Sequence, residues 1–165
     1  MNSEKLGIIF DGGGFLGAFG AGCMRAAEDR GFRADYFQGV SVGALNAAKM
    51  TELGGINSRI LEFVWNQMDA NGQAALFPTR QIPRNLLRSH LFPPRGLVEL
   101  IEPLDCAAVI RSRVDLDIIA TNERTEREKI FTNRDAALQR DPELLKQYLL
   151  ASAALPAVFP SVRLS

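Results

Sequence analysis

Residues 36–48, YFQGVSVGALNAA, decide the fold that we expect for this chain of 165 residues. The apolar residues before Ser41 indicate a buried strand, and the run of helix formers after it indicates a helix. Gly39 and Gly43 stand two positions before and after Ser41, which gives the pattern G-x-S-x-G. Side chains at those two positions would collide in a sharp turn between strand and helix. The pattern predicts an elbow that presents the Ser41 hydroxyl above a sheet edge, with the N–H of Val42 facing an oxyanion.

A second glycine-rich stretch, residues 11–17 (DGGGFLG), follows the short apolar run 6–10 and precedes a segment that we expect to be helical. A short continuous apolar run that ends at glycines is typical of a buried parallel strand. We expect the glycines Gly12, Gly13 and Gly14 to let backbone N–H groups point into a pocket and bind the oxygen of a tetrahedral intermediate.

Three alternatives remain for these two stretches. Gly12, Gly14 and Gly17 also satisfy G-x-G-x-x-G, the fingerprint of dinucleotide-binding proteins, and Asp35 stands near the place of the acid that binds ribose. Asp35 precedes the second strand, however, whereas the ribose acid belongs at the carboxyl end of that strand. The glycines could also serve only close helix–strand packing, and Ser41 could serve only as a helix N-cap.

Composition restricts the class of protein. The 19 Lys and Arg residues balance 19 Asp and Glu residues, so no basic excess indicates a nucleic-acid partner. Cys23 and Cys106 lie in apolar runs without metal-ligand spacing, so we expect buried thiols, a reducing compartment and no metal. We find no apolar run long enough for a signal peptide or a membrane span. The sequence therefore predicts one soluble, cytoplasmic domain over residues 1–165.

Strands and helices alternate along the rest of the chain, which predicts an α/β fold with helices on both faces of a sheet. A proline-rich stretch, residues 69–103, is expected to cross the surface without marking a second domain. The other elements that we expect are helices over 15–30, 44–53, from Ser58 to Met68 and from Asp141 to Ala153, strands over 36–40, 114–120 and 129–132, and the start of a strand at residue 165.

Four blocks of sequence, taken in order, resemble the patatin-like phospholipases. The blocks are DGGGFLG at 11–17, GVSVGALNA at 39–47, DIIATN at 117–122 and ASAALPAVFP at 151–160. The resemblance implies a three-layer α/β/α fold with a mostly parallel central sheet. It also implies a lipid acyl hydrolase, of the phospholipase A, lysophospholipase or esterase type, that needs no cofactor and uses a Ser–Asp dyad. Ser41 matches the nucleophile of that family.

Two positions depart from the family pattern. Leu16 stands where the family commonly has Arg or Lys beside the oxyanion loop. The dyad aspartate of the family follows the Phe-Pro block, in an Asp-Gly motif that would lie beyond Ser165. We therefore expect this chain to be a fragment without its general base, and a serine hydroxyl without a base is a weak nucleophile.

Other residues admit a functional and a structural interpretation. His90 is the only histidine, so any Ser–His–acid triad would have to use it, but we favour a structural histidine. Asp115 and Asp117 are expected to point to the same face of a strand. They could form a pair of carboxylates, but we favour the interpretation that they lie on a face exposed to solvent. Trp65 is expected to pack against a neighbouring helix rather than to stack on a ligand. The segment 77–92 is either a lid, a weak contact with a lipid surface or a plain connection.

The partner expected from the sequence is a lipid acyl ester, bound by a protein that can attach peripherally to a membrane. A catalytically inert remnant that binds lipid or a partner protein is the remaining alternative. The sequence does not determine the oligomeric state.

Overall fold

The computed structural model describes residues 5–76 and 92–164, and the side chains that it describes are those of residues 5–68 and 92–164. The predictions for His90 and for residues 77–91 lie outside this part of the chain.

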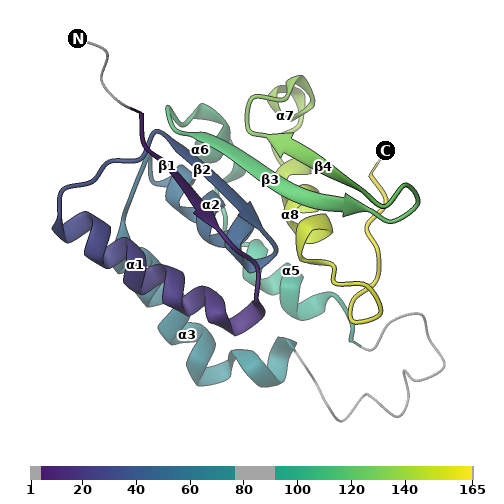
Figure 1. Ribbon diagram of the computed structural model, residues 1–165. Coiled ribbons are helices and arrows are strands. Elements are labelled where there is room, and N and C mark those ends of the chain that lie inside the picture. Colours follow the sequence, from purple (N-terminus) through teal and green to yellow (C-terminus); the bar gives the residue numbers. More distant parts are fainter. Residues whose placement is uncertain (1–4, 77–91, 165) are drawn as a thin grey trace.

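The core of the fold is a four-stranded sheet with the order β1-β2-β3-β4 (Figure 1). Its strands are β1 (Gly7–Phe10), β2 (Tyr36–Val40), β3 (Asp115–Asn122) and β4 (Arg127–Thr132). The first three strands are parallel, and β4 pairs antiparallel to β3. The parallel strands are joined through helices, as parallel pairing requires. The predicted α/β class and mostly parallel sheet are confirmed.

The helices begin and end close to the predicted positions in the first third of the chain. A short 3-10 helix, η1 (Gly14–Leu16), leads into α1. The α-helices of the described residues are α1 (Gly17–Asp29), α2 (Val42–Glu52), α3 (Ser58–Leu76), α5 (Arg95–Ile101), α6 (Cys106–Arg111), α7 (Ala136–Arg140) and α8 (Leu144–Ala153). None of them combines the length and the apolar character that a membrane crossing needs.

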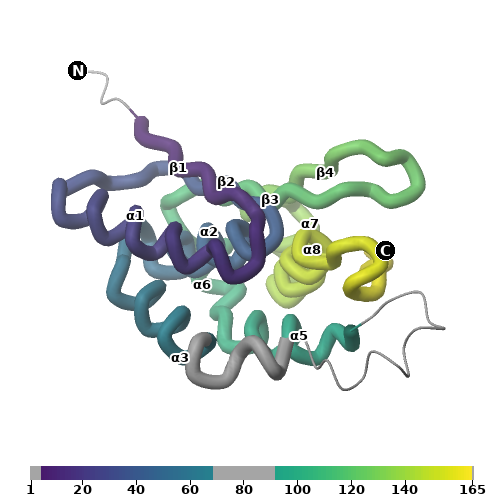
Figure 2. The backbone as a smooth tube through the Cα atoms, turned by 60° about the horizontal axis from the view of Figure 1, so that its bottom comes forward, coloured from purple at the N-terminus to yellow at the C-terminus, as the bar shows by residue number. Residues whose placement is uncertain are grey.

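The described helices lie on one face of the sheet (Figure 2), so the second helical layer that the sequence predicts is not seen among the described residues. Helix α2 contacts β1, β2 and β3, and α8 contacts β3, while α3 and α5 lie against α1 and α8. Buried and more exposed residues alternate along the strands accordingly, since side chains at every second position point to the same face of the sheet. Phe37, Leu116 and Ile118 face the helices and are at most 1% exposed. This face therefore contains the apolar core.

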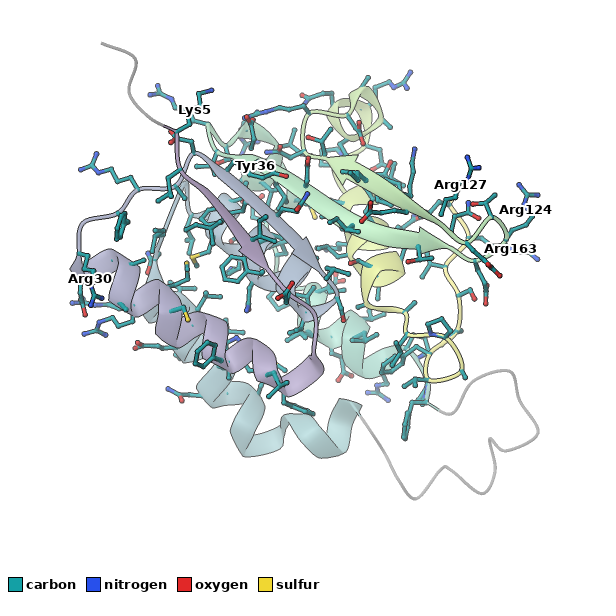
Figure 3. The ribbon with its side chains drawn as sticks, viewed as in Figure 1. Lys5, Arg30, Tyr36, Arg124, Arg127 and Arg163 are labelled. Atoms are coloured by element: carbon teal, nitrogen blue, oxygen red, sulfur yellow. The ribbon has the colours of Figure 1, made fainter. Side chains whose placement is uncertain are left out.

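The opposite face of the sheet has no helical cover among the described residues, and it is more polar. Tyr36 on β2 donates a hydrogen bond of 2.9 Å to a carboxylate oxygen of Asp117 on β3 (Figure 3). Partial burial, and then this hydrogen bond, raise the pKa of Tyr36 to about 12. Asp115 forms an ion pair of 2.7 Å with Arg134. Asp115 and Asp117 thus point to the same face, as predicted, and both have partners there.

Several predictions about local structure were wrong. Cys23 is exposed, because the small residues around it in α1 gave no clear apolar face; only Cys106 is buried, and burial raises the pKa of its thiol to about 11. Helix α3 continues to Leu76, since a glycine inside a helix costs only about 1 kcal/mol. Residues 161–164, which lead to the predicted strand start, form no strand, and residue 165 itself lies outside the described residues.

The short helices α6 and α7 were not predicted, because so few residues show no clear period. Helix α8 begins at Leu144 rather than at Asp141. The carboxylate of Asp141 instead accepts a hydrogen bond from the backbone N–H of Glu143. The aspartate and the following proline thus form a turn before the helix, which places the start of α8 later than the sequence indicated.

Asn133, directly after β4, is a buried polar residue whose side chain bonds three backbone groups. Its side chain is fully buried, accepts a hydrogen bond from the N–H of Leu116 at 3.0 Å, and donates to the carbonyl oxygens of Val109 and Val114 at 3.1 Å each. These bonds join α6, β3 and the end of β4.

We expect Asn133→Ala to lower the free energy of unfolding by about 3 kcal/mol, because it leaves buried backbone groups without partners. Urea denaturation measures this loss. Asn122→Ala is the matched control, because Asn122 also accepts backbone hydrogen bonds but at the exposed hairpin turn. Equal losses in the two variants would contradict the role assigned to Asn133.

Candidate active site

Ser41 occupies the turn between the carboxyl end of β2 and the start of α2, as the sequence predicts for an elbow. Its backbone has φ 56° and ψ −127°, a conformation that residues with a side chain rarely adopt. Strained backbone of this kind costs on the order of 1–3 kcal/mol and persists only where the surroundings enforce it. Such strain occurs often at functional sites, so it directs attention to the Ser41 hydroxyl.

The glycines on either side of Ser41 explain how the turn is enforced. A Cβ atom on Gly39 would lie 2.3 Å from the carbonyl oxygen of Gly43. A Cβ atom on Gly43 would lie 2.3 Å from the carbonyl oxygen of Phe10 and 2.5 Å from that of Asp11. The turn therefore brings the start of α2 against both the preceding strand and the end of β1, and only glycine fits at either position.

The glycine-rich loop that follows β1 lies beside Ser41. A Cβ atom on Gly12 would be 3.5 Å from the Cβ atom of Ser41. Gly13 and Gly14 have φ values of 136° and 57°, which favour glycine. Among the described residues, the backbone N–H groups of Gly13, Gly14 and Val42 have no hydrogen-bond acceptor. No described acceptor occupies these donors, and their role as an oxyanion hole stays a prediction.

Ser152 supports the elbow from the end of α8, and the sequence analysis assigned it no role. The backbone N–H of Ser41 donates a hydrogen bond of 2.8 Å to the Ser152 hydroxyl. That hydroxyl in turn donates to the carbonyl oxygen of Ile119 on β3 at 2.6 Å. Ser152 therefore fixes the backbone of Ser41 to the neighbouring strand. Its position in the block 151–160 was the only signal in the sequence.

A buried pair of polar side chains holds the start of α1 against α2. The amide nitrogen of Asn46 donates to the carbonyl oxygen of Gly17 at 3.0 Å, and the indole nitrogen of Trp65 donates to the amide oxygen of Asn46 at 3.1 Å. A Cβ atom on Gly17 would lie 2.6 Å from Trp65 and 2.8 Å from Val42. Trp65 packs against a helix as predicted, and it also positions the glycine loop through Asn46.

Ser41 opens into a cavity of about 130 Å³. Besides Ser41, the described residues that line this cavity are Gly14, Phe15, Val42, Leu45, Met68, Leu97, Leu100, Ala153, Leu155, Val158 and Phe159. None of these carries a charge. An apolar wall suits an acyl chain, and hydrogen bonds from backbone N–H groups to a developing negative charge are strong where water is excluded.

Asp35 lies at the wrong end of the sheet for the dinucleotide interpretation. Its carboxylate accepts a hydrogen bond from the N–H of Leu6, and its backbone N–H donates to the carbonyl of the same residue. Both contacts are at the amino ends of β1 and β2, whereas the glycine loop follows the carboxyl end of β1. Asp35 therefore cannot bind the ribose of a nucleotide held by that loop. In the described part of the chain, no group of three His, Cys, Asp or Glu side chains could hold a metal ion.

Comparison with known families agrees with this geometry. The sequence model of the patatin-like phospholipases matches residues 8–165. The match covers nearly all of the chain, so the protein belongs to the patatin-like phospholipase family, a family of lipid acyl hydrolases. No curated protein matches the chain.

We expect Gly43→Ala to destabilise the protein by about 3 kcal/mol, because the added methyl group would overlap two backbone carbonyl groups that cannot move independently. Gly22→Ala is the control: Gly22 lies inside α1, and a Cβ atom there meets nothing within 4 Å. That variant should be more stable than the wild type by about 0.5–1 kcal/mol. Thermal unfolding of both variants measures these shifts, and a Gly43→Ala protein of wild-type stability would refute the close approach described here.

We expect Ser152→Ala to lower stability by about 2 kcal/mol, because the N–H of Ser41 and the carbonyl of Ile119 both lose their partner. Ser161→Ala provides the comparison, since the Ser161 hydroxyl bonds only the exposed Glu123. Its effect should stay within about 0.5 kcal/mol. Chemical denaturation of the two variants would show similar losses if Ser152 did not hold the elbow.

Proposed function

We propose that the protein is a serine acyl hydrolase, a carboxylic ester hydrolase acting on fatty acyl esters of lipids, with Ser41 as its nucleophile. The observation that carries the proposal is the strained conformation of Ser41 in the wall of an apolar cavity, beside backbone N–H groups that have no acceptor among the described residues. Family membership supports lipid substrates in general, and the site geometry supports this particular serine.

In the proposed reaction, the oxygen of Ser41 forms a bond to the carbonyl carbon of the ester, and the carbonyl oxygen takes the negative charge. The N–H groups of Gly13, Gly14 and Val42 donate to this oxygen, and Gly12 lets the loop approach Ser41 closely. Collapse of the tetrahedral intermediate breaks the ester bond, and the alcohol leaves with a proton. Water then attacks the acyl-enzyme and releases the fatty acid, which restores the serine.

The N–H of Ser41 itself takes no part in this proposal, because it already donates to Ser152. The proton of the Ser41 hydroxyl needs a base. We assign this role to the dyad aspartate that the family resemblance implies after the Phe-Pro block, beyond residue 165. The cytoplasmic location, the peripheral contact with a membrane and the single domain over residues 1–165 stay predictions of the sequence.

We expect a fluorophosphonate probe to label Ser41 in the full-length protein, because such probes react with activated serine hydroxyls. Ser41→Ala should abolish labelling and reduce ester hydrolysis on the order of 10⁴-fold or more. Ser161→Ala, an exposed serine away from the cavity, should be labelled like the wild type. A folded full-length protein that takes no label would contradict the proposed function and favour an inert lipid-binding protein.

A further inference from the structure

A second and larger cavity, of about 650 Å³, lies between α2, α3 and α5, whose arrangement is visible in Figure 1. Its volume falls within the range of small-molecule sites in proteins. Apolar side chains form most of its wall. Those contributed by α3 and α5 include Ile60, Leu61, Phe63, Val64, Trp65, Met68, Leu100 and Ile101.

The two cavities are neighbours with a common wall. Val42, Leu45, Met68 and Leu100 line both the larger cavity and the cavity of Ser41. Because the same four side chains line both spaces, the two cavities lie against each other, and a movement of these side chains would join them. Leu100 lies on α5 and is half-buried, so it is a suitable position at which to block such a connection.

The larger cavity extends along α2, away from Ser41. Val42, Leu45, Asn46 and Lys49 all line it, and the distance from the first to the last of these along the helix axis is about 10 Å. The amide of Asn46 lies about one helical turn from Val42, and Lys49, whose amine forms an ion pair of 2.7 Å with Glu52, lies about one turn farther. Gln67 on α3 and Glu99 on α5 also line the cavity, so its wall is mostly apolar with a few polar side chains.

We infer that the larger cavity binds the acyl chain of the substrate and makes the enzyme prefer chains long enough to pass beyond the cavity of Ser41. This inference rests on the proposed function and adds the part of the substrate that the site selects. The ester group would lie at Ser41 and the first carbons of the chain against Val42 and Leu45. The rest of the chain would lie beside Trp65, and the alcohol portion would remain on the side of the glycine loop.

Trp65 makes binding measurable without catalysis. It is the only tryptophan of the 165 residues and lines the larger cavity. Fatty acids with a bromine on the last carbon quench tryptophan fluorescence on contact. We expect ω-bromododecanoate to quench Trp65 saturably in this chain, and ω-bromobutanoate at the same concentration to quench it no more than free bromide does. Non-saturable quenching by both acids would overturn the inference.

Two variants on α5 test the route. Leu100→Phe places a larger side chain where the two cavities meet, and Val98→Phe makes the same kind of change on the exposed side of the helix. In the full-length protein, Leu100→Phe should lower the ratio of kcat/KM for the p-nitrophenyl esters of dodecanoate and butanoate by about tenfold. Val98→Phe should leave the ratio unchanged. Equal ratios in the two variants, with both folded, would overturn the inference.

The same set of measurements separates this inference from the proposed function. Labelling of Ser41 without saturable quenching of Trp65 would overturn the acyl-chain site and leave the hydrolase in place. Saturable quenching in a protein that takes no fluorophosphonate would support the chain-binding cavity and refute the hydrolase. Saturable quenching that is weakened equally by Leu100→Phe and Val98→Phe would overturn the assigned route.

Discussion

The close approach of three backbone segments at Ser41 is the constraint on which the rest of the structure depends. The start of α2 lies against β2 through Gly39 and against the end of β1 through Gly43. No side chain can separate these segments, so the two strands and the helix must pack in one arrangement. The strain at Ser41, on the order of 1–3 kcal/mol, is offset by burial along α2, where Ala44, Ala47, Ala48 and Met50 are fully buried.

The glycines allow the backbone segments around Ser41 to come close together, and hydrogen bonds from polar side chains then fix their orientation. Small residues let α2 lie close to the sheet, but they cannot fix the direction of the segments around it. Asn46 does this for the glycine loop through Gly17, and Ser152 does it for the elbow through Ile119. Each of these side chains has partners for its polar atoms, so each orients a neighbour without leaving a buried group unpaired. The candidate site therefore consists of segments far apart in the sequence, held by few directional bonds.

The two faces of the sheet have different surroundings, and the site lies at the edge of the apolar one. On the helix side, the cavity of Ser41 is bounded by uncharged, mainly apolar residues, and the larger cavity beside it mostly by apolar side chains. On the other side, Tyr36, Asp117, Asp115 and Arg134 satisfy one another. The charged groups of that face are thus paired with one another, and no charged side chain is among the described residues that line the cavity of Ser41.

The sequence by itself determined the strands, the elbow at Ser41 and the place of the glycine loop after β1. Those features follow from local rules, since strand period and glycine geometry are set within a few residues. It did not reveal the exposure of Cys23, the short helices α6 and α7, or the hydrogen bond from Ser41 to Ser152. Only the tertiary structure decided these, and the common wall of the two cavities, because each depends on which distant segments meet.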